Sequence, residues 1–425
     1  MQLGNGSQIV IVGGGPSGSF TALHLLNYAA QAGIKLDITI LEPRNFKQSG
    51  PGGCNKCAGV LSPNLTNNLK TLELELPKEV IQSEIAFYIL HLNGVKLTVR
   101  RPDSHHNIYS VYRGSGPRIV GVPAVRSFDG WLLDEAEKRG ANILRRRVLN
   151  IKRDVKPIVI TPREEIPTDL VVVATGVNTP APLDDNWGYK PPTTEVMAQD
   201  EVPRPDSFAD DSVSVFFDHP SGIIFGAVIP KGRYANISLL GHGMPKNAVG
   251  AFLDAHGLTD FFSTKAPGLC GCTPNVSVSK AENFFADRMA AVGDASVTRL
   301  YKDGIGAAYL TSQAVAKTAV YQGVSRRDFE TGFKPVCGQI DADNQYGKWL
   351  FRLWSASRRS TWLMNAWRRA IQYEANLPPE DHVHTRVLWG MFTGSESYRQ
   401  LFWLSISRRA FAGMWRGAWL NLNNH

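Results

Sequence analysis

Two cysteines, Cys54 and Cys57, lie close together in the glycine-rich stretch SGPGGCNKCAGVLSP, residues 49–63. A pair at this spacing can supply half of a zinc site, form a reversible disulfide, or place a thiol against a bound cofactor. Zinc would need further ligands, and the other close pair is Cys270 and Cys272 in LCGCTP. A cysteine that packs as a small hydrophobe is a fourth alternative. The spacing alone leaves all four open.

A glycine pattern near the N-terminus carries a second chemical signal. Gly13, Gly15 and Gly18 form GxGxxG in VGGGPSGS, directly after an apolar run and at the start of a helical pattern. The first glycine permits a tight turn, the second lets a pyrophosphate approach the backbone, and the third lets helix pack on strand. Glu42 closes the next apolar run, where its carboxylate can accept hydrogen bonds from an adenosine ribose. This arrangement predicts a dinucleotide-binding βαβ unit.

A third pattern, MAAVGDASVTRLYKDGIGAAYLTSQAVAKTAV from Met289, decides between dinucleotides. Asp294 ends a short apolar strand and can accept hydrogen bonds from the ribityl hydroxyls of FAD. A long helix is predicted to begin at Gly304-Ile305-Gly306, where its dipole favours a reduced, anionic flavin. Alone, Asp294 could merely cap a core helix. Together with GxGxxG, the pattern predicts FAD rather than NAD.

The elements that must position these residues indicate an α/β protein. We expect a Rossmann-like FAD-binding domain from residues 1–60, 100–180 and 287–337. An antiparallel β-sheet substrate domain is expected from residues 61–99 and 181–286, because 213–240 alternates strand-like runs with turns. Asn93-Gly94 predicts a hairpin turn within it.

Composition limits the cellular setting. The chain has 425 residues and five cysteines, a low, odd number that favours reduced thiols. No run reaches the roughly 18 apolar residues of a membrane-spanning helix, so we expect a cytoplasmic protein. The net charge of +8 indicates an anionic partner, and no recognised module favours nucleic acid.

These segments together resemble the FAD-dependent geranylgeranyl reductase family, within the wider fold shared with aromatic-ring hydroxylases such as p-hydroxybenzoate hydroxylase. The resemblance covers about residues 8 to 335. The matching pieces, in the family's order, are VGGGPSGS, LEPR, KCAGVLSP, RSFDGWLLDEAEKRGA, VVVATG, GAVIPKG and VGDASVTRLYKDGIGAAYLTSQA. Two departures stand out: Tyr301 replaces a proline found in many relatives, and ATGVNT replaces the ADG turn frequent in the hydroxylases.

The resemblance implies which residues contact the cofactor. Gly13, Gly15, Ser17 and Gly18 would lie at the pyrophosphate, Glu42 at the ribose, Arg126 near the phosphate and ribityl region, Ala174 and Gly176 by the adenosine, and Asp294, Gly304, Ile305 and Gly306 around the flavin. Arg44, from LEPR, and Ala58 and Gly59, from KCAGVLSP, complete the expected FAD-binding set. No metal is expected.

The resemblance also implies an activity, the reduction of carbon–carbon double bonds in an isoprenoid chain of a lipid or quinone. Cys57 matches the cysteine that lies against the flavin ring in these reductases and is the candidate catalytic residue. NAD(P)H or a ferredoxin would supply electrons, since no second dinucleotide fingerprint is present. An aromatic hydroxylase or related oxygenase is the alternative, and a flavin-bound lipid-binding or sensor protein without turnover is a third.

The segment 338–425 differs from the rest of the chain and is expected to be helical. Paired arginines punctuate an aromatic-rich sequence. Its tryptophans are Trp349, Trp354, Trp362, Trp367, Trp389, Trp403, Trp415 and Trp419. Amphipathic helices that bind an anionic membrane surface have this composition, which would make the protein peripheral at the membrane. A helical lobe that buries its tryptophans against the flavin domain is the alternative.

Overall fold

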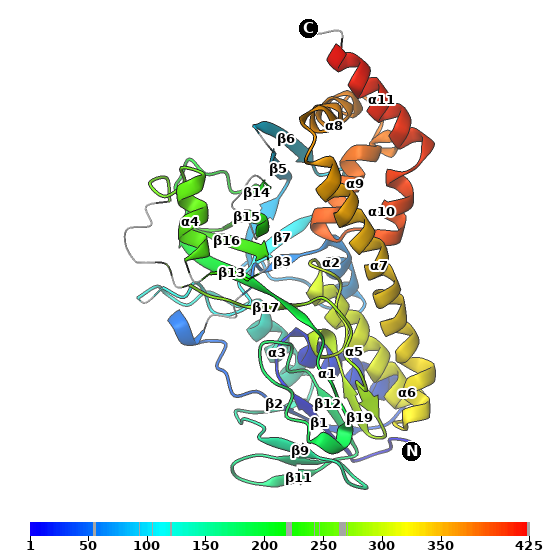
Figure 1. Ribbon diagram of the computed structural model, residues 1–425. Coiled ribbons are helices and arrows are strands. Elements are labelled where there is room, and N and C mark those ends of the chain that lie inside the picture. The colour runs from blue at the N-terminus through cyan, green and yellow to red at the C-terminus, as the bar shows by residue number, and fades with distance from the viewer. Residues whose placement is uncertain are drawn as a thin grey trace.

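The computed structural model describes residues 1–422 apart from 54–56, 93, 104, 120, 218–222, 242, 246, 263–268 and 270. Figure 1 shows the helices of residues 361–422 gathered at one end of the molecule and the N-terminal sheet at the other, with the long helix of residues 334–357 running between them. Parallel strands, antiparallel sheets and C-terminal helices are all present. The predicted fold class is therefore confirmed.

A six-stranded sheet with the order β18-β19-β12-β1-β2-β8 forms the centre of the first lobe. All neighbouring strands are parallel except β18 and β19. The strands are β1 (Ser7–Val12), β2 (Leu36–Leu41), β8 (Asn142–Leu144), β12 (Leu170–Val173), β18 (Phe285–Ala286) and β19 (Met289–Ala291). Helix α1 (Pro16–Gln31) packs against both α3 (Phe128–Lys138) and α5 (Gly304–Tyr321). Helices pack on this sheet, and its central strand β12 is apolar and buried along its whole length.

A seven-stranded sheet with the order β17-β13-β16-β15-β14-β5-β6 forms the second lobe. Its strands are β5 (Phe87–Leu92), β6 (Val95–Arg100), β13 (Thr194–Pro203), β14 (Ser212–Phe216), β15 (Ile223–Lys231), β16 (Tyr234–Gly241) and β17 (Asn275–Ser277). The predicted meander is the antiparallel run β14, β15 and β16. β5 and β6 pair as the expected hairpin, although Asn93 of its turn lies outside the described residues.

Smaller elements complete the two lobes. One three-stranded sheet contains β3 (Val60–Leu61), β4 (Ile81–Ile85) and β7 (Ile108–Val111), and another contains β9 (Asn150–Lys152), β10 (Ile158–Ile160) and β11 (Glu165–Pro167). The remaining helices before the C-terminal segment are α2 (Pro63–Lys70), α4 (Ala248–Ala255) and α6 (Arg326–Gly332). Leu65, Leu69 and Val80 belong to the core of the first lobe, whereas the sequence grouped residues 61–99 with the second. The domain division otherwise stays a prediction.

The C-terminal segment is helical, as expected. Its helices are α7 (Lys334–Ser357), α8 (Thr361–Glu374), α9 (Val383–Thr393), α10 (Tyr398–Ser405) and α11 (Arg408–Leu422). Trp354 and Trp389 are buried in one core with Val213 and Val215 of the second sheet. Among the described residues, no helix has both the length and the hydropathy needed to cross a membrane.

Candidate functional site

A cavity of about 1020 Å³ is lined by residues of both lobes. Most of the sequence-predicted residues line it, namely Gly13, Gly15, Ser17, Glu42, Arg44, Cys57, Ala58, Gly59, Ala174, Gly176, Asp294, Gly304 and Ile305. Gly18, Arg126 and Gly306 are not among the lining residues. The fold therefore brings together segments that are up to about 290 residues apart in the chain.

The glycine turn between β1 and α1 forms one end of this cavity. Gly13 has a φ of +108°, and a Cβ there would lie 2.5 Å from the carbonyl oxygen of Ala174. A Cβ on Gly18 would lie 1.9 Å from the carbonyl oxygen of Gly13, so this glycine allows helix and strand to pack behind the cavity. Gly15 faces more open space and begins α1 without a side-chain cap. The first amides of α1 are therefore available to an anion.

Glu42 holds the glycine turn in place. Its buried carboxylate accepts the Gly14 N–H at 2.8 Å and the Arg44 N–H at 2.9 Å. A Cβ on Gly14 would lie 2.8 Å from the Glu42 Cβ, which shows how closely the two segments approach. Glu42 thus fixes the backbone of the turn as well as lining the cavity.

Arg113 is a cavity-lining cation that the sequence analysis missed. Its Nε and Nη2 donate to the two carboxylate oxygens of buried Asp129 at 3.0 and 2.8 Å. Although burial opposes it, the charge of Asp129 raises the pKa of Arg113, so the guanidinium stays charged. Arg126, expected near the cofactor phosphate, is exposed and lies 3.8 Å from Glu79. Two sequence features could have pointed to Arg113: its position just after strand β7, and the acidic partner Asp129 in the motif RSFDG.

Asp294 and the start of α5 lie at another wall of the cavity. Burial raises the pKa of Asp294, while the charge of Arg113 and the neighbouring Thr298 hydroxyl act in the opposite direction. A Cβ on Gly304 would lie 3.2 Å from Thr298 Oγ1 and 3.7 Å from Asp294 Oδ1, so the backbone approaches the carboxylate closely. The Gly306 N–H donates to Asp303, the cap of α5. The expected flavin contact of Gly306 stays a prediction.

The loop containing Cys57 is fixed by residues of two strands. The Gly59 N–H lies 3.4 Å from Cys57 Sγ, and buried Lys231 donates to the Cys57 carbonyl at 3.1 Å while pairing with Glu201 at 2.9 Å. Gly59 has a φ of +69°, and a Cβ there would lie 2.0 Å from the Val111 carbonyl oxygen. The glycine is therefore needed for backbone approach to β7.

The structure describes three of the five cysteines. Cys57, Cys272 and Cys337 are free cysteines. Cys54 and Cys270 lie outside the described residues. Among residues 1–422 without the gaps given above, no group of His, Cys, Asp and Glu side chains is arranged as a metal site.

The part of the cavity toward the second lobe is apolar and aromatic. Its walls include Val213, Val215, Phe225, Ala227 and Ile229 from β14 and β15, with Tyr88 and Phe392 beside them. The Tyr88 ring stacks on Phe392 at 5.9 Å and meets Trp389 edge-on at 5.5 Å. We call this part the apolar chamber. It can hold a hydrophobic substrate with little water.

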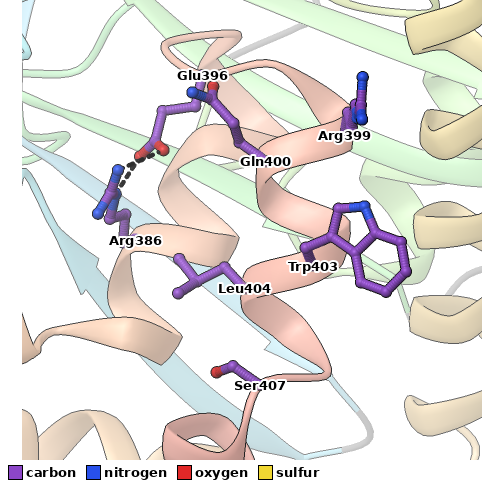
Figure 2. A pocket seen from close by; sticks show the side chains of 7 residues that line it. All are labelled: Arg386, Glu396, Arg399, Gln400, Trp403, Leu404 and Ser407. Carbon is purple, nitrogen blue, oxygen red and sulfur yellow. Dashed lines mark hydrogen bonds and ion pairs between the residues drawn. The ribbon is translucent and has the colours of Figure 1, made fainter.

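A smaller groove of about 420 Å³ lies on the C-terminal helices. Arg386 and Glu396 form a bidentate ion pair there, drawn in Figure 2. Nε donates to Oε1 at 2.5 Å and Nη2 donates to Oε2 at 2.8 Å. Arg399 and Trp403 project away from this pair, one turn apart on α10. The groove has no glycine turn and no thiol, so the larger cavity is the candidate active site.

Comparison with solved structures identifies the fold over nearly the full chain. A geranylgeranyl bacteriochlorophyll reductase-like protein from Thermoplasma acidophilum has a TM-score of 0.57 and 16% identity, covering 97% of this chain and 96% of its own. A flavoprotein/dehydrogenase from Cytophaga hutchinsonii has a TM-score of 0.61 and 14% identity, covering 98% and 100%. The fold is that of flavin-dependent oxidoreductases.

Oxygenases share this flavoprotein fold as well. A 2-methyl-3-hydroxypyridine-5-carboxylic acid oxygenase has a TM-score of 0.59 and 15% identity, covering 84% of this chain and 92% of its own. No protein-family model and no curated protein sequence matches the chain. At these identities the similarity to solved structures establishes the fold alone.

The residues present fit a dinucleotide cofactor. The open backbone at Gly15, the uncapped start of α1 and the charged Arg113 together favour a pyrophosphate. Asp294 offers a carboxylate for hydroxyl groups. Both features line the same cavity as the loop with Cys57.

Proposed function

We propose that this protein binds FAD and reduces carbon–carbon double bonds of an isoprenoid chain. The observation that carries the proposal is the continuity of one cavity, from the glycine turn past Cys57 into the apolar chamber. A substrate in that chamber would lie against the cofactor with most of its surface removed from water. The likeness to the reductase-like protein, which extends over the C-terminal helices, supports the same activity.

The residues around the cavity supply distinct parts of the reaction. Gly15, the start of α1 and Arg113 would hold the phosphates of FAD, and Asp294 would hold the ribityl chain. The flavin, when bound, would supply hydride for one alkene carbon. The Cys57 thiol holds a proton for the other carbon. The apolar chamber orients the chain and excludes water, since an isolated alkene accepts hydride only when well aligned.

An aromatic hydroxylase is the second candidate function, because the chamber walls carry the rings of Tyr88, Phe225 and Phe392. Substrate-dependent oxygen consumption would favour it. Anaerobic loss of a substrate alkene, with reoxidation of reduced flavin, would favour the reductase. A flavin-bound lipid carrier or sensor would give neither signal. The electron donor, NAD(P)H or a ferredoxin, is identified by which one reduces the bound flavin.

We also propose that the protein is cytoplasmic and contacts an anionic membrane surface through its C-terminal helices. Several large aromatic side chains of α7, α8, α10 and α11 are exposed, namely Trp349, Trp362, Trp403, Phe411 and Trp415. Arginines lie beside aromatic rings there, as Arg352 does with Trp349 and Arg416 with Tyr373. Aromatic rings beside arginines suit the boundary between lipid headgroups and water.

The cofactor part of the proposal is tested by titrating the protein with FAD and with NAD. We expect a yellow protein that retains FAD and not NAD. Asp294→Ala should lose most of the cofactor, since a charge-assisted hydrogen bond contributes about 1.5 to 3 kcal/mol, whereas Asp294→Asn should bind more tightly than Asp294→Ala. Unchanged FAD affinity in Asp294→Ala would show that this residue only shapes the start of α5.

A further inference from the structure

Lys302 places a cation in the wall of the apolar chamber. Its Nζ lies 4.8 Å from the centre of the Phe225 ring and 5.9 Å from that of Phe392. No hydrogen bond or ion pair joins this ammonium group to another residue in the described part of the chain. In the described residues, the faces of these two rings are therefore the contacts that stabilise the Lys302 ammonium group.

The polar residues near Lys302 in the sequence form hydrogen bonds with groups other than its ammonium group. Asp303 caps α5 by accepting the Gly306 N–H at 3.2 Å. Tyr301 donates to Glu195 at 3.0 Å, and Arg299 donates to the Gly394 carbonyl at 2.6 Å. The neighbouring acids are thus engaged by other groups.

The same chamber also contains a phenol group. Tyr88 lines the same chamber, and its ring stacks on Phe392, one of the two rings under Lys302. In the described residues no group hydrogen-bonds to the Tyr88 hydroxyl. Within the described part of the chain, the chamber therefore combines apolar walls with two hydrogen-bond donors that have no protein acceptor.

An ammonium group in such surroundings is stabilised by an incoming anion. Burial lowers the pKa of Lys302 to about 8, so the side chain still carries its proton at neutral pH. Cation–π contact offsets only part of the lost hydration. An oxyanion beside the ammonium group would supply a charge-assisted hydrogen bond in a poorly hydrated space.

We propose that Lys302 and Tyr88 form a recognition site for a singly charged oxygen acid, a carboxylate or phenolate, on a substrate that is otherwise apolar. One ammonium and one hydroxyl group match one such acid. A diphosphate would call for several cations, whereas Arg299 donates to the Gly394 carbonyl and Arg113 is assigned to the phosphates of the cofactor. The inference deepens the proposed function, because it names the polar group that a substrate in the same chamber would carry.

The test compares acids with the matching alcohols on the FAD-loaded, full-length protein by isothermal titration calorimetry. The probes are geranic acid against geraniol, and 4-hydroxybenzoate against 4-hydroxybenzyl alcohol. We expect at least one acid to bind about tenfold more tightly than its alcohol, or about 1.4 kcal/mol. Lys302→Met should remove this preference without weakening alcohol binding. Lys302→Arg should keep part of it, and Tyr88→Phe should reduce it.

The outcomes separate this inference from the proposed isoprenoid reduction. A Lys302-dependent preference for 4-hydroxybenzoate, with no binding of geranic acid or geraniol, supports the recognition site and overturns the isoprenoid substrate. A preference that persists in Lys302→Met, or the absence of any acid preference in the unchanged protein, overturns the recognition site. FAD content and melting temperature of Lys302→Met, compared with the unchanged protein, control for folding.

Discussion

The Cys57 thiol belongs to a loop that both lobes hold in place. Gly59 approaches the backbone of β7, while Lys231 of β15 donates to the Cys57 carbonyl. Since Lys231 is buried and paired with Glu201, it anchors the Cys57 carbonyl beside the cavity. Such an anchor suits a group that would have to meet a substrate at a defined distance.

Replacing this thiol tests its chemical role. We expect Cys57→Ser to bind FAD and accept electrons nearly normally, but to reoxidise with an isoprenoid substrate about tenfold more slowly, a loss of about 1.4 kcal/mol. A serine hydroxyl holds its proton more tightly than a thiol. Anaerobic stopped-flow absorbance separates the two half-reactions, with Cys54→Ser as the control. Equal reoxidation rates for Cys57→Ser and the unchanged protein would remove the thiol from the mechanism.

Asp303 makes stability depend on pH at the residue scale. Burial raises the pKa of this carboxyl to about 6, with Ser62, Arg299 and the Gly306 amide acting against burial. The folded state therefore binds the proton more tightly than the unfolded state does. The resulting stability is present below the unfolded pKa and is lost as pH rises through about 6.

The Asp303→Asn variant isolates this effect, because asparagine can still cap α5. Relative to the variant, the unchanged protein should lose roughly 2 kcal/mol in the free energy of unfolding between pH 4 and pH 7. Denaturant unfolding of both proteins at several pH values measures the difference. Parallel pH profiles would mean that Asp303 ionises normally.

At the scale of elements, the C-terminal helices have two kinds of tryptophan. Trp354 and Trp389 are buried against the second sheet, while Trp403 is 56% exposed and Trp415 is 78% exposed. The sequence offered a membrane face and a helical lobe packed on the flavin domain as alternatives. The buried tryptophans lie against the second sheet instead of the flavin-domain sheet, and the exposed rings leave the membrane contact as a proposal.

Exposed positions test that contact without disturbing the core. The unchanged protein should float with anionic vesicles, less so at high salt and hardly at all with neutral vesicles. Trp403→Ser combined with Trp415→Ser should reduce flotation several-fold. Tyr321→Ser, which replaces an exposed ring at the end of α5, is the matched control. If the double variant floats as well as the control, these tryptophans do not contact lipid.

At the scale of the molecule, the C-terminal segment is part of the hydrophobic core of the second lobe. Leu350, Trp354, Met364 and Trp389 pack in the same cluster as strands β5, β14 and β15. Each buried aromatic ring removes a large apolar surface from water. Deleting the segment would therefore expose the face of the sheet that it covers.

We expect residues 1–337 alone to lose the cooperative thermal transition of the full chain or to aggregate. Truncation would leave the facing apolar side chains of β5, β14 and β15 in water, and the roughly 5 to 15 kcal/mol that typically stabilises a domain leaves little margin for such a loss. Calorimetry and circular dichroism of the two proteins decide the point. A truncated protein that melts sharply near the full-length temperature would show that the helices form a separate unit.

Local sequence was enough to predict the glycine turn, Glu42, Asp294 and the helix at Gly304. These predictions depend on backbone conformation and on the ends of adjacent strands, both of which are set by residues near in sequence. The strand-like runs of residues 213–240, separated by turn residues, likewise predicted the meander of β14, β15 and β16.

Only the tertiary structure revealed the roles of Arg113, Lys231 and Lys302. Arg113 meets Asp129 across 16 positions, and Lys231 reaches the Cys57 carbonyl across 174. Lys302 lies over rings that belong to β15 and α9. A charged residue has no periodic pattern that gives its partner, since the partner depends on which distant elements pack together. The sequence therefore determined the glycine turn, and packing decided which charges line the cavity.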